Sequence, residues 1–247
     1  MPILDAAGLR CTFNLNSGVF AAPGTVYPQG RIHRPMTEEQ AVRLYSGTGH
    51  EVAVHTRTHP DLTQLSAPEI VREVAADRER LEQLFGGIVR GAAYPFGRFN
   101  DTVVEVLRAC GIAYCRTVIS SHSFDLPRDP LRLEATCHHD DPRLEELCDR
   151  FLMPETTGLF YLWGHSYEFE AHDNWSLIEN FARRMGGHED IWYCTNIQAI
   201  DYIGVWRSVR RSMDGRTLHN PSAQTMWLKA PDGQVRCLEG GSTLREE

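Results

Sequence analysis

The chain has 247 residues, 42% of which are hydrophobic, and its formal net charge is −8. These values are typical of a globular protein with a sizeable core, and the negative charge argues against nucleic acid or an anionic membrane as the main partner. No apolar stretch reaches the roughly 18 residues of a membrane-spanning helix, and no basic segment leads into an apolar N-terminal run. The seven cysteines form no Cys-x-x-Cys pair. We therefore expect reduced thiols, no zinc ribbon and, on this sequence, a cytoplasmic location.

Short apolar segments alternate with amphipathic helical patterns along most of the chain. The predicted strands are Arg10–Leu15, Glu51–Thr56, Gly91–Tyr94, Ala113–Val118, Leu131–His138, Gly158–Trp163 and Asp190–Cys194. The predicted helices begin at capping residues, which are Thr37 and Ser66 in capping boxes, then Asp101, Asp141, Asn174 and Thr195.

This alternation predicts an α/β fold with a parallel sheet and crossover helices, either a barrel or an open doubly wound sheet. In both, chemistry is expected in the loops at the carboxyl ends of the strands. The tail differs, because 224–230 and 234–238 flank Pro231-Asp232-Gly233 and predict a β-hairpin.

The strongest chemical signal is a pair of histidines, His55 and His59, directly after a predicted strand. If the chain turns helically there, both rings face one side and can share a divalent ion. The alternative is two solvated loop histidines, since His-x-x-x-His is common by chance. The preceding strand and the Thr58-His59-Pro60 sequence favour the metal site.

The segment Gly49–Pro60 resembles the metal-binding motif of the polysaccharide deacetylases, the NodB-like deacetylases of carbohydrate esterase family 4. Further segments similar to that family are Thr12–Asn16, Asp61–Ser66, Tyr94–Gly97 and Trp163–His165. Their order and spacing agree over residues 1–200. The resemblance implies an irregular (β/α) barrel, with a catalytic domain over 1–205 and a β-hairpin extension over 206–247 packed on the same domain.

The resemblance also implies roles for individual residues. His55 and His59 would be metal ligands, the backbone N–H of Phe96 would contribute to the oxyanion hole, and His165 would be the general acid. Expected substrate contacts are Asn16, Tyr94, Trp163 and Tyr167. The implied metal is zinc, with cobalt, nickel or manganese as alternatives, and the implied reaction removes an N-acetyl or O-acetyl group from a saccharide.

One departure from the family concerns the catalytic base. The family's Asp-Asp pair, which supplies the base and the third metal ligand, lies upstream of the strand that holds Thr12. In this chain, Ile3–Leu9 is predicted to end a helix, so we expect Asp5 on a helix surface and leave the base unassigned. Two explanations remain: the sequence starts late relative to the family and lacks its first strand, or the protein is a catalytically impaired, carbohydrate-binding relative. A related amidase is a weaker third possibility.

A second polar cluster, Thr136–Asp141, includes His138 and His139. It could be a second metal site or a substrate contact. A polar loop in which Asp141 caps the next helix is the favoured interpretation.

Overall fold

The computed structural model describes residues 1–229 and 233–245. These residues form two compact units, Met1–Ile197 and Gln198–Glu247. The boundary between the units falls inside helix α8 (Asn196–Ser208). Among the described residues, no helix is both long and apolar enough to cross a membrane.

The first unit contains a five-stranded parallel sheet in the order β1-β2-β3-β4-β5. Its strands are β1 (Thr12–Leu15), β2 (Glu51–Val54), β3 (Gly91–Ala93), β4 (Tyr114–Ser120) and β5 (Leu133–Ala135). The predicted parallel α/β sheet is thus confirmed, with sequential strands as neighbours, which is the arrangement that crossover helices produce.

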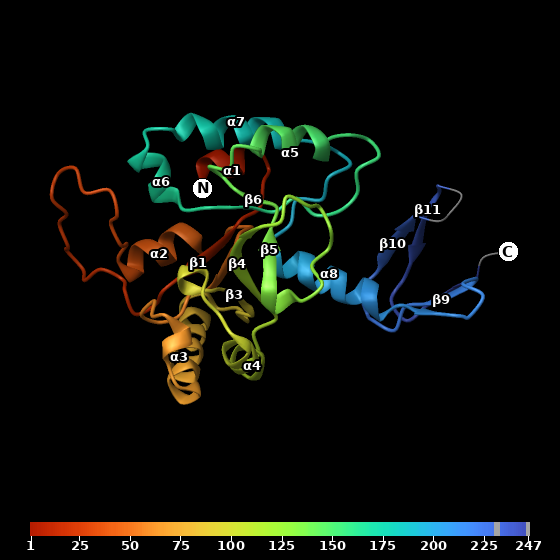
Figure 1. Cartoon of the computed structure of the whole chain (residues 1–247), viewed down its shortest axis with the longest axis horizontal. Coiled ribbons are helices and arrows are strands. Elements are labelled where there is room, and N and C mark those ends of the chain that lie inside the picture. The colour runs from red at the N-terminus through yellow and green to blue at the C-terminus, as the bar shows by residue number, and fades with distance from the viewer. Residues whose placement is uncertain (230–232, 246–247) are drawn as a thin grey trace. The chain divides into compact units, whose positions relative to one another are not determined.

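Helices lie in the connections from β1 to β4. They are α2 (Glu38–Tyr45), α3 (Ala67–Phe85) and α4 (Asp101–Ala109), whereas α1 (Pro2–Ala6) precedes β1. The apolar stripes of α3 and α4 pack with strand residues such as Val54 and Ala92 into one buried cluster. Figure 1 shows α3 and α4 on one side of the strands and α1 on the other.

A second layer follows β5. A two-stranded parallel sheet pairs β6 (Cys137–His138) with β7 (Leu162–Trp163). Around it lie α5 (Leu144–Phe151), α6 (Ser166–Ala171) and α7 (Trp175–Met185). The apolar faces of α5 and α7 share a buried cluster with Cys137, and both helices lie near α1 in Figure 1.

The second unit is antiparallel. The predicted hairpin is confirmed as β10 (Met226–Lys229) paired with β11 (Val235–Leu238), although its turn residues Pro231 and Asp232 lie outside the described residues. A three-stranded sheet combines β8 (Arg210–Arg211), β9 (Thr217–His219) and β12 (Thr243–Arg245). Leu218, Met226 and Leu238 form its buried core, with the α8 residue Tyr202 packed against it.

Three sequence predictions need correction. Asp141 is not the cap of α5, because the N-cap of this helix is Arg143. The predicted strand Asp190–Cys194 is wrong, because this segment has no strand conformation; its Tyr193 hydroxyl donates to the Met185 carbonyl and accepts the His188 N–H instead. The cap of α4 is Asn100 rather than Asp101, since the Asn100 side chain accepts the Val103 N–H.

Candidate functional site

Residues from three strand-to-helix connections carry the candidate site. His55 and His59 follow β2, Phe96 follows β3, and His165 follows β7. All of these loops leave the carboxyl ends of parallel strands, where functional groups of α/β folds gather.

The two histidines after β2 face each other. Their Nε2 atoms are 3.1 Å apart. The Nδ1–H of His55 donates to the Ala93 carbonyl at 2.9 Å, which leaves the lone pair on its Nε2. A backbone carbonyl that fixes the tautomer in this way is a common support for metal-ligating histidines.

Both imidazoles favour the neutral form. Burial lowers the pKa of His55 to about 3, and the positive charges of His59, Arg116 and His165 act in the same direction. Burial also lowers the pKa of His59. Since a divalent metal binds the neutral imidazole, two adjacent neutral rings fit such an ion.

The backbone of the histidine loop is unusual. Thr56 and His59 have φ values of 65° and 60°, in the left-handed region that residues with a Cβ rarely adopt. The Thr56 hydroxyl accepts the His59 N–H at 3.2 Å, and the Asn16 amide donates to the carbonyls of His55 and Thr56. Asn16, predicted as a substrate contact, thus holds the shape of this loop.

Asp77 of α3 holds the same loop through a hydrogen bond to its backbone. Its two carboxylate oxygens accept the backbone N–H groups of Ser17, at 2.7 Å, and of His55, at 3.1 Å. Burial raises the pKa of Asp77 to about 6, although both hydrogen bonds favour the ionised form. The sequence analysis missed this residue, yet a signal exists: Asp77 lies on the buried stripe of α3 with Val74 and Leu81.

Phe96 also has a left-handed backbone, with φ of 56°. Its ring is 61% exposed and makes an edge contact with His59, with the ring centroids 4.6 Å apart. The neighbouring Tyr94, predicted to contact substrate, is only 1% exposed, and its hydroxyl donates to the Leu131 carbonyl. The structure therefore gives Tyr94 a position in the core.

Aromatic rings surround His165. The rings of Trp163 and Tyr167 lie 5.7 and 5.2 Å from the His165 ring, so these three predicted residues are brought together. Arg116, which the sequence analysis did not single out, is buried and lies 4.3 Å from the centre of the Trp163 ring. Arg116 is paired in register with Ala93, beside the His55 tautomer contact.

Glu168 connects His165 to the second histidine pair. Its Oε1 lies 3.1 Å from Nδ1 of His165, and its Oε2 accepts the backbone N–H of His165 at 3.0 Å. The same Oε2 lies 3.3 Å from Nε2 of His138 and 3.5 Å from Nε2 of His139. The polar loop predicted for His138 and His139 therefore turns toward His165, a consequence of the β6–β7 pairing that sequence alone does not reveal.

Asp5 and Asp141 each pair with a histidine outside the His55–His59 pair. Asp5 is on α1, its side chain is half exposed, and it pairs with His50 at 2.8 Å, in agreement with a helix-surface residue. Asp141 accepts the Arg143 N–H just before α5, and it pairs with His122 at 2.7 Å.

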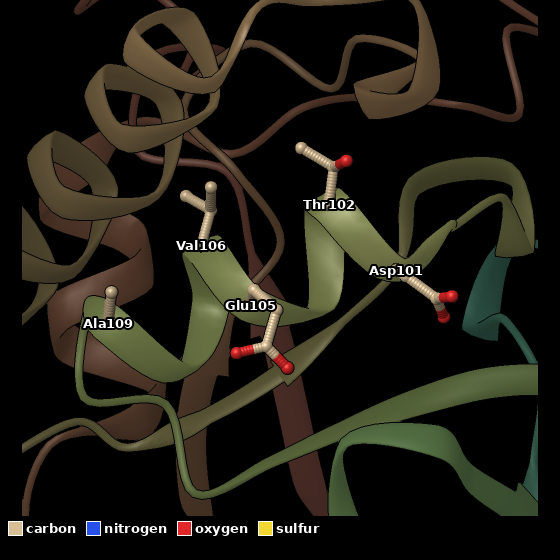
Figure 2. Close-up of a pocket in the computed structure, with 5 residues that line it drawn as sticks. All are labelled: Asp101, Thr102, Glu105, Val106 and Ala109. Carbon is tan, nitrogen blue, oxygen red and sulfur yellow. The ribbon is translucent and has the colours of Figure 1, made fainter.

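Figure 2 shows a surface hollow on α4, whose lining residues include none of these histidines. It is lined by Asp101, Thr102, Glu105, Val106 and Ala109. Its lining offers two carboxylates and no imidazole or thiol, so we assign no chemistry to it.

Comparison with known proteins finds a family similarity in the N-terminal part of the chain. Residues 1–115 match the family model described as polysaccharide deacetylase. The chain is 30% identical over 89 residues to the chitooligosaccharide deacetylase of Sinorhizobium fredii, covering 36% of this chain and 41% of that protein. It is 28% identical over 67 residues to the uncharacterized protein YlxY of Bacillus subtilis, covering 27% and 21%. The chain thus spans less than half the length of either relative.

Solved structures give weaker similarities. The Streptococcus pyogenes deacetylase PplD in complex with acetate matches at 23% identity and a TM-score of 0.44, over 54% of each chain. A carbohydrate esterase family 4 pseudoenzyme from Bacillus anthracis, BA3943, matches at 19% identity and a TM-score of 0.48, over 81% of this chain and 58% of that one. Both scores are low, and we infer nothing about function from them.

Proposed function

We propose that this chain, whose residues 1–115 match the polysaccharide deacetylase family model, is a hydrolase that removes N-acetyl or O-acetyl groups from a saccharide. The observation that carries the proposal is the His55–His59 pair, with Nε2 atoms 3.1 Å apart and the His55 tautomer fixed by Ala93. Two neutral imidazoles held this way fit zinc or a similar divalent metal.

In this proposal, His55 and His59 hold a divalent metal, which when bound would polarise the acetyl carbonyl and activate water. The N–H of Phe96 donates a hydrogen bond to the developing oxyanion. His165 moves a proton from its Nε2 to the leaving amine or hydroxyl, and the Glu168 carboxylate lies 3.1 Å from its Nδ1. Trp163 and Tyr167 provide stacking surfaces for the sugar.

Two finer features of the family fold remain part of the proposal. One is that the five-stranded sheet and the β6–β7 pair belong to an irregular (β/α) barrel. The other is that residues 1–205 act as the catalytic domain, with 206–247 as a C-terminal extension. A saccharide is the proposed partner.

A second candidate function is a carbohydrate-binding relative with impaired catalysis. The observation that favours it concerns the carboxylates beside β1 and β2. Asp5 is paired with His50, and both oxygens of Asp77 accept backbone N–H groups. Neither carboxylate is therefore placed as a base for the His55–His59 pair.

Acetate release from an N-acetylated chitooligosaccharide, measured with zinc-reconstituted protein, tests the proposal. We expect turnover by the wild type, a loss of roughly 10²–10⁴-fold in His165→Gln, and a larger loss in His55→Ala. The matched control is His219→Ala, which removes an imidazole that contacts Thr243 in the second unit.

Two other outcomes separate the candidates. Saccharide binding by calorimetry without acetate release would support the binding relative. Acetate release that His55→Ala leaves unchanged would refute the metal-dependent mechanism.

A further inference from the structure

We propose that His138, His139 and Glu168 form a second divalent-cation site, separate from the His55–His59 pair. Each of the three side chains offers one ligand atom, and these atoms all lie within 4.8 Å of one another. The proposal rests on the geometry of this cluster and does not depend on the proposed deacetylase activity.

Two of the three separations between the ligand atoms match those around one small ion. Oε2 of Glu168 lies 3.3 Å from Nε2 of His138 and 3.5 Å from Nε2 of His139. Ligands bound to tetrahedral zinc at about 2.0–2.1 Å are roughly 3.3–3.4 Å from one another. The cluster is therefore already near the spacing that coordination requires.

His139 supplies an independent indication of a ligand. Its side chain is 2% exposed, and its buried Nε2 has no hydrogen-bond partner. Oxygens of Asp140 and Glu168 lie 3.2 and 3.5 Å away from that nitrogen, but neither forms a hydrogen bond with it. Because buried polar groups almost always have a partner, a nitrogen surrounded by carboxylate oxygens without a hydrogen bond is better explained by a cation between them.

The surroundings hold the His139 ring in place. A Cβ on Gly164 would lie 1.7 Å from Nδ1 of His139, so the ring occupies the space above a residue without a side chain. The rings of His138 and Phe169 lie 4.2 and 4.4 Å from it. A ligand fixed by packing loses little conformational entropy when it binds a metal.

Glu168 can bind the cation and still contact His165. Its Oε1 is directed toward Nδ1 of His165, whereas its Oε2 is directed toward the two other histidines. Coordination through Oε2 would leave the Oε1 contact in place. The Glu168 carboxylate would thus bridge the cation and His165.

Two imidazoles and one carboxylate are a donor set that suits zinc, with at least one position left for water. At His138, Nδ1 accepts the Asp140 N–H at 3.2 Å, and coordination through Nε2 would place the ring proton on Nδ1 and break this long contact. Burial lowers the pKa of His139, which keeps this imidazole in the neutral form that a metal binds.

Zinc titration of metal-free full-length protein by calorimetry, with Co²⁺ absorption as a second readout, tests the inference. We expect two zinc ions in the wild type and one in the double variant His55→Ala/His59→Ala. Adding Glu168→Gln or His138→Gln to that double variant should weaken the remaining zinc by at least about tenfold. The matched control is Glu179→Gln, an exposed carboxylate on α7.

The result that would overturn the inference is a double variant that is folded by circular dichroism but binds no zinc. Retained zinc that neither Glu168→Gln nor His138→Gln weakens would overturn it as well. If the double variant loses acetate release but still binds one zinc, the loss bears on the proposed function, and the retained zinc supports the second site.

Discussion

The carboxylate of Asp77 accepts the backbone N–H of His55 at 3.1 Å, and this contact joins helix α3 to the end of strand β2. The other Asp77 oxygen accepts the Ser17 N–H. A single buried side chain thus fixes two chain segments beside the histidine pair. The backbone position of His55 therefore depends on α3 as well as on the loop that carries it.

Replacing this carboxylate tests that dependence. Asp77→Asn retains one acceptor oxygen but places an amide NH₂ against the second N–H donor. We expect the free energy of unfolding to fall by about 1–3 kcal/mol, because one buried donor loses its partner. Urea unfolding measures it, and Glu79→Gln on the exposed face of α3 is the control. Equal stability of the two variants would contradict the anchoring role.

The pH dependence of zinc binding tests the low pKa of His55. A histidine with an ordinary pKa near 6.5 would lose about tenfold in metal affinity at pH 5.5, because protonation competes with the metal. Burial lowers the pKa of His55 to about 3, so His55 stays neutral at pH 5.5, and burial also lowers the pKa of His59. We therefore expect the His55–His59 pair of Glu168→Gln, in which the proposed second site is weakened, to lose no more than about tenfold in zinc affinity between pH 7.5 and 5.5.

A drop in zinc affinity near a hundredfold between pH 7.5 and 5.5 would show that both histidines have ordinary pKa values near 6.5. Calorimetry at the two pH values distinguishes the cases, with circular dichroism as the check that the protein stays folded.

The backbone at Phe96 stores strain that substitution can reveal. At φ of 56°, a residue with a Cβ is disfavoured, whereas glycine is not. We expect Phe96→Gly to be about 1 kcal/mol more stable than Phe96→Ala, the reverse of the usual order in helices and strands. Chemical denaturation of the two variants measures the difference. A more stable alanine variant would argue against the left-handed conformation.

Gly164→Ala tests the packing of His139. The added methyl would lie 1.7 Å from Nδ1 of His139, so either the ring or the β7 loop must move. We expect a loss of about 1–3 kcal/mol in unfolding free energy, as for overpacked cores. Gly87→Ala, at a position with open space, provides the comparison. Wild-type stability in Gly164→Ala would mean that the ring does not occupy this position.

Local signals in the sequence predicted much of the fold. The capping boxes at Thr37 and Ser66 are confirmed, since each needs only a partner three residues away. Strand pairs β1–β2 and β3–β4 followed from the alternating pattern. The segment Asp190–Cys194 has strand-like composition, but contacts of the Tyr193 side chain give it another conformation.

The site was predictable only where its residues are close in sequence. The His55–His59 pair is visible as a four-residue spacing. Asp77 contacts Ser17 across 60 residues, and Glu168 lies beside His138 only because β6 pairs with β7. Such contacts depend on the tertiary structure, so no residue spacing in the sequence predicts them.

Anomalous diffraction at the zinc edge, from crystals of the zinc-loaded protein, tests the central claim most directly. The account predicts a peak bonded to Nε2 of both His55 and His59, at about 2.0–2.1 Å from each nitrogen. Zinc-loaded crystals without a peak between these two nitrogens would contradict the claim that the pair binds a metal.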